Sequence, residues 1–210
     1  KANFYSLQIK RDGDGNPAER DFSELSHKVA LRFSEFTGRN EVPVKYLLLS
    51  EHISYMQISG IFIPYTGEAN VNKNNVLSDL PFCMAHEMAH RYAIAPEDEA
   101  NFFSFYILEG SDDPFLAYSA YLAAIRYCQN ALYQANYDEF ARIYGLYNEY
   151  VRRDLLQYNN HWDKYSGKLA DISHNVNDVY LMLQGESEGV KSYSEMVDYM
   201  LAWFDKMNVE

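Results

Sequence analysis

The sequence predicts an α+β fold that is mostly helical, with a small sheet in the N-terminal part and helices over the rest. Short β-prone runs occur at 44–49, 59–63 and 68–72. After residue 76, the apolar side chains recur instead at helical spacings. Strands that come early and helices that come late are typical of domains in which helices cover one face of a minor sheet.

One helix is expected before the strands. Apolar side chains recur at helical spacings from Phe22 to Phe36, and Thr37-Gly38 is a stop signal. Within the strand region, Pro64 and Gly67 interrupt the segment from Ile61 to Asn72, which favours an edge strand or loop over a central strand. Such an edge can hold an extended peptide by strand addition.

The later helices begin at recognisable signals. Pro81 and Pro96 each suit the first turn of a helix, where the missing N–H costs no hydrogen bond. The periodicity predicts helices at 77–92, 96–109, 114–133, 136–158, 174–184 and 193–206.

Length and charge limit the organisation and the partners. The 210 residues contain no Pro/Gly/Ser-rich linker, so a single domain over 1–210 is expected, with a sheet-containing part at about 1–75 and a helical part at about 76–210. The net charge of −12 argues against nucleic acid and against anionic lipid, because both require clustered basic residues.

The segment His86-Glu87-Met88-Ala89-His90 is the motif that carries chemistry. Histidines four residues apart lie on one face of a helix, where one tetrahedral zinc ion can bind a nitrogen of each. Glu87 then lies beside the metal, in the position of a general base that accepts a proton from a zinc-bound water.

A catalytic zinc needs a third protein ligand, and acidic residues follow the motif in Pro96-Glu97-Asp98-Glu99-Ala100-Asn101. Acids in a first helical turn are also favoured by the helix dipole, with no metal involved. Glu97 and Asn101 share a face of the expected helix, whereas Glu99 points roughly 200° away from Glu97. Only one of the two glutamates can therefore face the histidines.

A resemblance to known proteins decides between Glu97 and Glu99 as the third ligand. The spacing Glu97-x-x-x-Asn101 is similar to the E-x-x-x-D/N pattern of gluzincin-type zinc peptidases. The resemblance implies that Glu97 is the third ligand and that Asn101 orients a ligand histidine. Glu99 remains the alternative ligand.

From about residue 58 to the C-terminus, the chain also resembles a bacterial family of unknown function whose members look like membrane-anchored zinc metallopeptidases. The resemblance implies a zincin-like two-helix metal site packed against the small sheet. It also implies a membrane-associated parent protein, of which this chain is a soluble fragment. The segments that carry it are Pro64–Asn72, Leu80–Phe82, Glu97–Phe102, Tyr118–Tyr121, Asn175–Tyr180 and Gly189–Tyr193.

The chain departs from this family's pattern at two positions. Ala93 stands where a glycine often follows the second histidine by three residues, and Ala120 replaces the glycine of Tyr-Ser-Gly-Tyr. Neither position is a ligand, but both affect how closely the backbone can approach the site.

Stabilising a tetrahedral oxyanion requires a hydrogen-bond donor besides zinc. Tyr121 and Tyr118 are the leading candidates because they lie in a family-like segment, and Tyr180 and His174 follow. Among 19 tyrosines, packing is the default role of any one ring.

These residues predict a zinc-dependent metalloendopeptidase with one Zn²⁺ per chain and a peptide or protein substrate. The expected ligands are His86, His90 and Glu97, and the expected base is Glu87. The alternative is a noncatalytic zinc-binding or sensing domain of a membrane protein, and hydrolysis of a nonpeptide amide is a third possibility.

Overall fold

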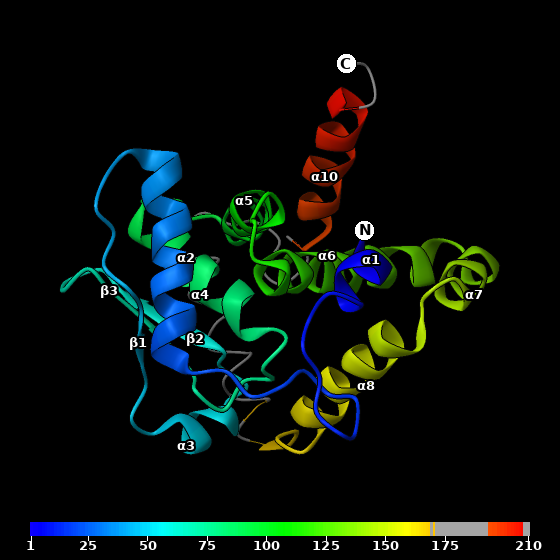
Figure 1. Ribbon diagram of the computed structural model, residues 1–210, viewed down its shortest axis with the longest axis horizontal. Coiled ribbons are helices and arrows are strands. Elements are labelled where there is room, and N and C mark those ends of the chain that lie inside the picture. The colour runs from blue at the N-terminus through cyan, green and yellow to red at the C-terminus, as the bar shows by residue number, and fades with distance from the viewer. Residues whose placement is uncertain (169, 171–192, 208–210) are drawn as a thin grey trace.

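The computed structural model describes residues 1–168, 170 and 193–207. Within them the chain is mostly helical and has a small mixed sheet near its N-terminus, which confirms the predicted fold class (Figure 1). The helices are α1 (Ala2–Ser6), α2 (Phe22–Thr37), α3 (Ser50–Ser54), α4 (Leu80–Arg91), α5 (Glu97–Glu109), α6 (Pro114–Ala135), α7 (Tyr137–Gly145), α8 (Glu149–Asp163) and α10 (Tyr193–Met207).

The sheet contains β1 (Lys45–Tyr46), β2 (Gly60–Ile63) and β3 (Glu68–Val71) in the order β1-β3-β2. β1 runs parallel to β3, and β2 runs antiparallel to it. The prediction of an edge from Ile61 to Asn72 was therefore right for β2 and wrong for β3, which is central. The reason is that Pro64 and Gly67 do not interrupt one strand but form the turn between two, where Gly67 has a φ of 67°.

The single helix expected at 136–158 is two helices. The chain leaves the helical path after Gly145, and the Asn148 side chain then caps a new helix by accepting a hydrogen bond from the backbone N–H of Val151. Short α1 and α3 were not predicted, because five residues carry too little periodicity to identify a helix. The helix expected at 174–184 lies outside the described residues.

Helix α4 lies at the centre of the packing. It contacts β2 and β3 on one side and α2, α5 and α6 on others (Figure 1). Its first turn contains Pro81, as expected, and its side chains Met84, Ala85, Met88 and Ala89 have no exposed surface. Because α4 is buried almost all round, the side chains that it carries have little freedom to move.

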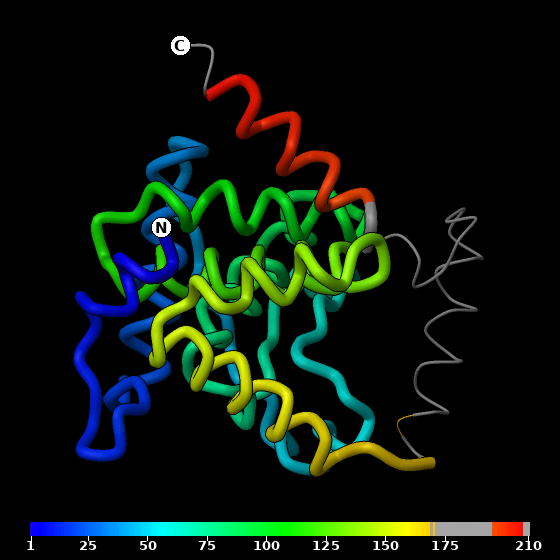
Figure 2. Tube along the Cα trace, turned by 90° about the vertical axis from the view of Figure 1, so that its right-hand side faces the viewer, coloured from blue at the N-terminus to red at the C-terminus, as the bar shows by residue number. Residues whose placement is uncertain are grey.

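None of the described helices combines the length with the apolar character needed to cross a bilayer. The last described helix, α10, packs on α5 and α6 through Met196 and Met200, and its C-terminal end projects away from the rest of the molecule (Figures 1 and 2).

A buried ionic network joins the N-terminal segment to α6 and α8. Arg11 donates two hydrogen bonds to the carboxylate of Asp154, at 2.9 and 3.2 Å, and the hydroxyl of Tyr118 donates a third at 2.5 Å. The Asp154 side chain has no exposed surface, and that of Arg11 is 8% exposed. The pair is therefore desolvated on both sides, and each charge depends on the other.

Replacing Asp154 by Ala should lower the free energy of unfolding by about 3–5 kcal/mol, because it leaves the guanidinium of Arg11 buried without its counter-ion. Urea unfolding followed by circular dichroism would measure the change. Glu139→Ala is the matched control, since its ion pair with Arg142 is exposed and should contribute within about 0.5 kcal/mol. Equal effects of the two substitutions would contradict the interpretation.

Candidate metal centre

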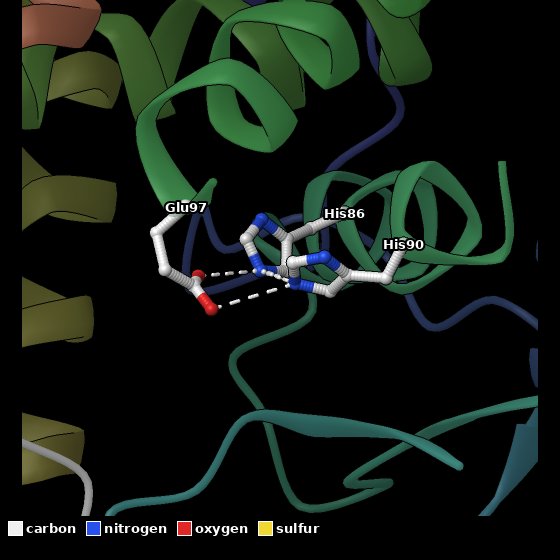
Figure 3. Close-up of side chains that lie close together, drawn as sticks. All are labelled: His86, His90 and Glu97. Atoms are coloured by element: carbon white, nitrogen blue, oxygen red, sulfur yellow. Dashed lines mark hydrogen bonds and ion pairs between the residues drawn. The ribbon is translucent and has the colours of Figure 1, made fainter. Parts of the chain in front are cut away.

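Three side chains from two consecutive helices converge in one place. His86 and His90 project from the same face of α4, and Glu97 reaches them from the first turn of α5 (Figure 3). The Nε2 atoms of the histidines are 3.0 Å apart. The Glu97 carboxylate lies 3.1 Å from Nε2 of His86 and 3.5 Å from Nε2 of His90.

These distances fit one bound metal ion. Ligand atoms about 2.0–2.1 Å from a tetrahedral zinc ion are about 3.3 Å from one another. The two nitrogens are 3.0 Å apart, one carboxylate oxygen lies 3.1 Å from His86 and the other oxygen lies 3.5 Å from His90, so both oxygens of Glu97 are near that distance from a histidine nitrogen. A cation between the two ring nitrogens would also complement lone pairs that otherwise face each other. The cluster of His86, His90 and Glu97 can therefore hold a metal ion.

The orientation of His90 is set by a backbone carbonyl. Nδ1 of His90 lies 2.8 Å from the carbonyl oxygen of Ile94, which can only accept a hydrogen bond. The proton is therefore assigned to Nδ1, and the lone pair of Nε2 points into the cluster. The ring of His90 also stacks on that of Phe62 from β2, with centroids 6.5 Å apart.

The residue that makes this hydrogen bond possible is Ala93. It has a φ of 62°, in the left-handed region that residues other than glycine rarely adopt. This conformation reverses the chain at the end of α4, and the backbone N–H of Ile94 then bonds back to the carbonyl of Ala89. Alanine in place of glycine here was expected from the sequence to affect the backbone near the site, and the left-handed conformation of Ala93 agrees with this.

Burial and neighbouring charges shift the pKa values of the three residues, and for His90 burial and the charge of His86 lower it. Burial alone lowers the pKa of His86, but the hydrogen bond and charge of Glu97, with smaller contributions from Glu87 and Asn101, raise it to about 9. Burial raises the pKa of Glu97, and the two histidines outweigh this and lower it. Without a metal ion, a proton on His86 thus takes the place of the cation.

Glu87 is buried beside the cluster, with 4% of its surface exposed. Burial raises its pKa to about 7, against a lowering by His86 and with a further raising by Glu97. A Cβ atom on Gly60 of β2 would lie 2.4 Å from the Glu87 carboxylate, so only glycine leaves room for this side chain. A carboxylate with this pKa can accept and return a proton near neutral pH.

Asn101 and Glu99, which the sequence analysis also placed near the metal, lie in different environments. Asn101 lies one turn after Glu97, is 3% exposed and contributes to the raised pKa of His86. Glu99 has an exposed side chain and is not part of the cluster. Of the two glutamates, only Glu97 is brought to the histidines.

The two tyrosines proposed as catalytic have partners elsewhere. The hydroxyl of Tyr118 donates to Asp154, and the hydroxyl of Tyr121 donates to Glu109 at 3.0 Å. Tyr118 has no exposed surface, and the ring of Tyr121 stacks on that of Tyr5. Their contacts support packing roles, so neither is retained as a catalytic residue. His174 and Tyr180 lie outside the described residues.

Two contributors to the site escaped the sequence analysis. The carbonyl of Ile94 carries no side-chain signal, so no motif could have identified it. Gly60 did carry a signal, since a glycine in a strand often marks a close approach of another group. Its partner, Glu87, became apparent only in the folded chain.

Replacing Ala93 by Gly should raise the free energy of unfolding by about 1 kcal/mol, because it relieves left-handed strain in the backbone. Urea unfolding in the presence of a chelator would measure this. Ala141→Gly, at an exposed position inside α7, should have the opposite sign and cost about 0.5–1 kcal/mol. Destabilisation by both glycines would contradict the role given to the left-handed turn.

Comparison with known proteins identifies a family but no activity. No curated protein and no solved structure matches the chain. A family model described as protein of unknown function (DUF3810) matches residues 1–201. This match begins well before residue 58, where the sequence-based resemblance was expected to start. The chain belongs to the family of proteins of unknown function called DUF3810.

Proposed function

We propose that this chain is a zinc-dependent metallopeptidase that binds one Zn²⁺ through His86, His90 and Glu97. The observation that carries the proposal is the buried carboxylate of Glu87 next to three potential ligands whose donor atoms all lie within 4.8 Å of one another. Burying a carboxylate without strong pairing costs stability, which is typical of a group retained for its chemistry.

The donor set favours zinc. Two histidine nitrogens and one carboxylate, with a fourth position left for water, are a common ligand set of catalytic zinc sites. When bound, zinc would lower the pKa of water to about 7 and polarise a carbonyl oxygen. The hydrogen bond from His90 to the carbonyl of Ile94 keeps one ligand in the tautomer that binds a metal.

Glu87 supplies the proton transfers in this proposal. Its carboxylate accepts a proton from water as the water attacks the carbonyl carbon, and then returns it to the departing amine. A pKa of about 7 suits both directions at neutral pH. Gly60 keeps β2 close to the carboxylate without displacing it, and so limits the access of bulk water.

The position of β2 supports a peptide substrate. β2 pairs with β3 on one side only among the described strands, and its first residue, Gly60, adjoins Glu87. A peptide added to the free edge would run in an extended conformation past the general base. A peptide or protein substrate, a single domain over residues 1–210 and a membrane-associated parent protein remain parts of the proposal.

The proposal is tested first by metal content and hydrolysis. Zinc in protein purified without added metal should be close to one ion per chain, measured by plasma emission spectroscopy. His90→Ala should lose most of it, because two ligands hold zinc weakly. Glu87→Gln should keep zinc but cleave a panel of unstructured peptides about 10²–10⁴-fold more slowly.

Two controls make these results specific. His27→Ala removes an exposed histidine of α2, and Glu99→Gln neutralises the exposed glutamate of α5. Both should keep zinc and activity. Zinc retained by His90→Ala at the unmutated level would refute the ligand assignment. Stoichiometric zinc with no cleavage of any peptide would favour the noncatalytic zinc-binding or sensing domain.

Metal binding should release protons in a pH-dependent way. Since the pKa of His86 is about 9 without metal, this histidine is protonated at pH 7 and must lose its proton to bind a cation. We expect at least one proton released per zinc at pH 7, from His86 and in part from Glu87, with affinity rising as the pH approaches 9. Calorimetry in buffers of different ionisation enthalpy measures the release. Zinc affinity independent of pH between 6 and about 8 would contradict it.

A further inference from the structure

A groove of about 600 Å³ lies between the segment 73–77, which precedes α4, and one face of α8. We call it the α8 groove; α8 is the yellow helix in Figure 2. Its volume falls in the range of ligand-binding clefts, about 300–1,000 Å³. None of the side chains assigned to the metal centre lines it.

The charge of the groove is opposite to that of the chain. The chain contains 30 acidic and 18 basic residues, yet the groove is lined by Lys73, Arg153 and Lys164 and by no acidic residue among those described. Arg153 is held in place by a hydrogen bond to the carbonyl of Asp14. The basic side chains attract an anionic segment locally, whereas the net charge of −12 repels it at long range, so only a segment that enters the groove is held.

The shape of the groove is long rather than compact. Arg153 of α8 and Lys164, the residue that caps the C-terminus of α8, stand eleven residues apart, with Gln157 and Asn160 between them at helical spacing. At about 1.5 Å per residue, this face extends about 16 Å. The same length accommodates about five residues of an extended chain.

The uncharged polar side chains suit a peptide backbone. Gln157 and Asn160 each offer an amide donor and an amide acceptor, whereas Asn74 donates both of its amide hydrogens to Ser54 and Tyr165 and offers only its carbonyl oxygen. This pairing matches the N–H and C=O groups of an extended peptide, whereas an inorganic anion uses donors only. We propose that the α8 groove binds an extended acidic segment of a protein, with its carboxylates on the basic side chains and its backbone on the amides.

The inference does not depend on the proposed peptidase activity. The test measures binding directly and involves no hydrolysis. The probe is a fluorescein-labelled octapeptide of alternating Glu and Ser, followed by fluorescence anisotropy at about 0.15 M salt, where the long-range repulsion by the acidic chain is screened beyond about 8 Å and close contacts in the groove are screened less. Octapeptides of alternating Gln and Ser and of alternating Lys and Ser are the comparison ligands.

Reversing the charges of Lys73 and Lys164 together, as Lys73→Glu/Lys164→Glu, should weaken binding of the acidic octapeptide about tenfold or more. Lys10→Glu/Lys206→Glu is the matched control, because both lysines are exposed and outside the groove, and the formal charge changes equally. Gln157→Leu/Asn160→Leu keeps the charge and should also weaken binding. Circular dichroism would verify that each variant is folded.

Three results would overturn the proposal. Equal weakening by the two lysine pairs would show attraction to the whole surface rather than to the groove. Unchanged binding in the amide variant would show that the peptide backbone is not recognised. Displacement of the octapeptide by inorganic phosphate at similar concentration would identify a small-anion site. Binding of the acidic octapeptide that is sensitive to both groove variants, and not to the control, would support it.

Discussion

The burial of helix α4 is the constraint on which the rest of the structure depends. The helix is enclosed by the sheet and by α2, α5 and α6. Burial of its apolar side chains on these neighbours therefore fixes the position and rotation of the helix. Its two histidines then point to the one side where α5 begins. The left-handed turn at Ala93 completes this geometry, because it brings Glu97 back to the histidines and aims the Ile94 carbonyl at His90.

The same burial explains why the site is chemically unusual. His86, Glu87 and Glu97 are ionisable groups in a poorly solvated place, and burial alone disfavours the charged form of each. Mutual attraction stabilises His86 with Glu97, whereas Glu87 gains less and keeps a pKa of about 7. A bound cation would favour the neutral histidines and the ionised carboxylates together. Without a metal ion, the cost of burying these ionisable groups is therefore less well compensated than the closeness of the ligand atoms would suggest.

The two proposed sites bind their ligands in physically different ways. The metal centre depends on a few buried groups held at fixed distances, and small displacements would abolish it. The α8 groove depends on exposed charges and amides along a helix face, where binding is weaker and more sensitive to salt. The metal centre would carry out the chemistry, and the groove would select which acidic segments remain close to the protein.

Local sequence patterns by themselves determined most of the secondary structure and the identity of the two histidine ligands. Periodicity located α2, α4, α5 and α6, and the spacing of His86 and His90 implied a shared face, because these are properties of a single helix. Only the tertiary structure decided that β3 is the central strand, that Glu97 faces the histidines while Glu99 is exposed, and that Tyr118 and Tyr121 bond elsewhere. These outcomes depend on how one element packs on another, and such contacts between distant residues leave no periodic trace in the chain.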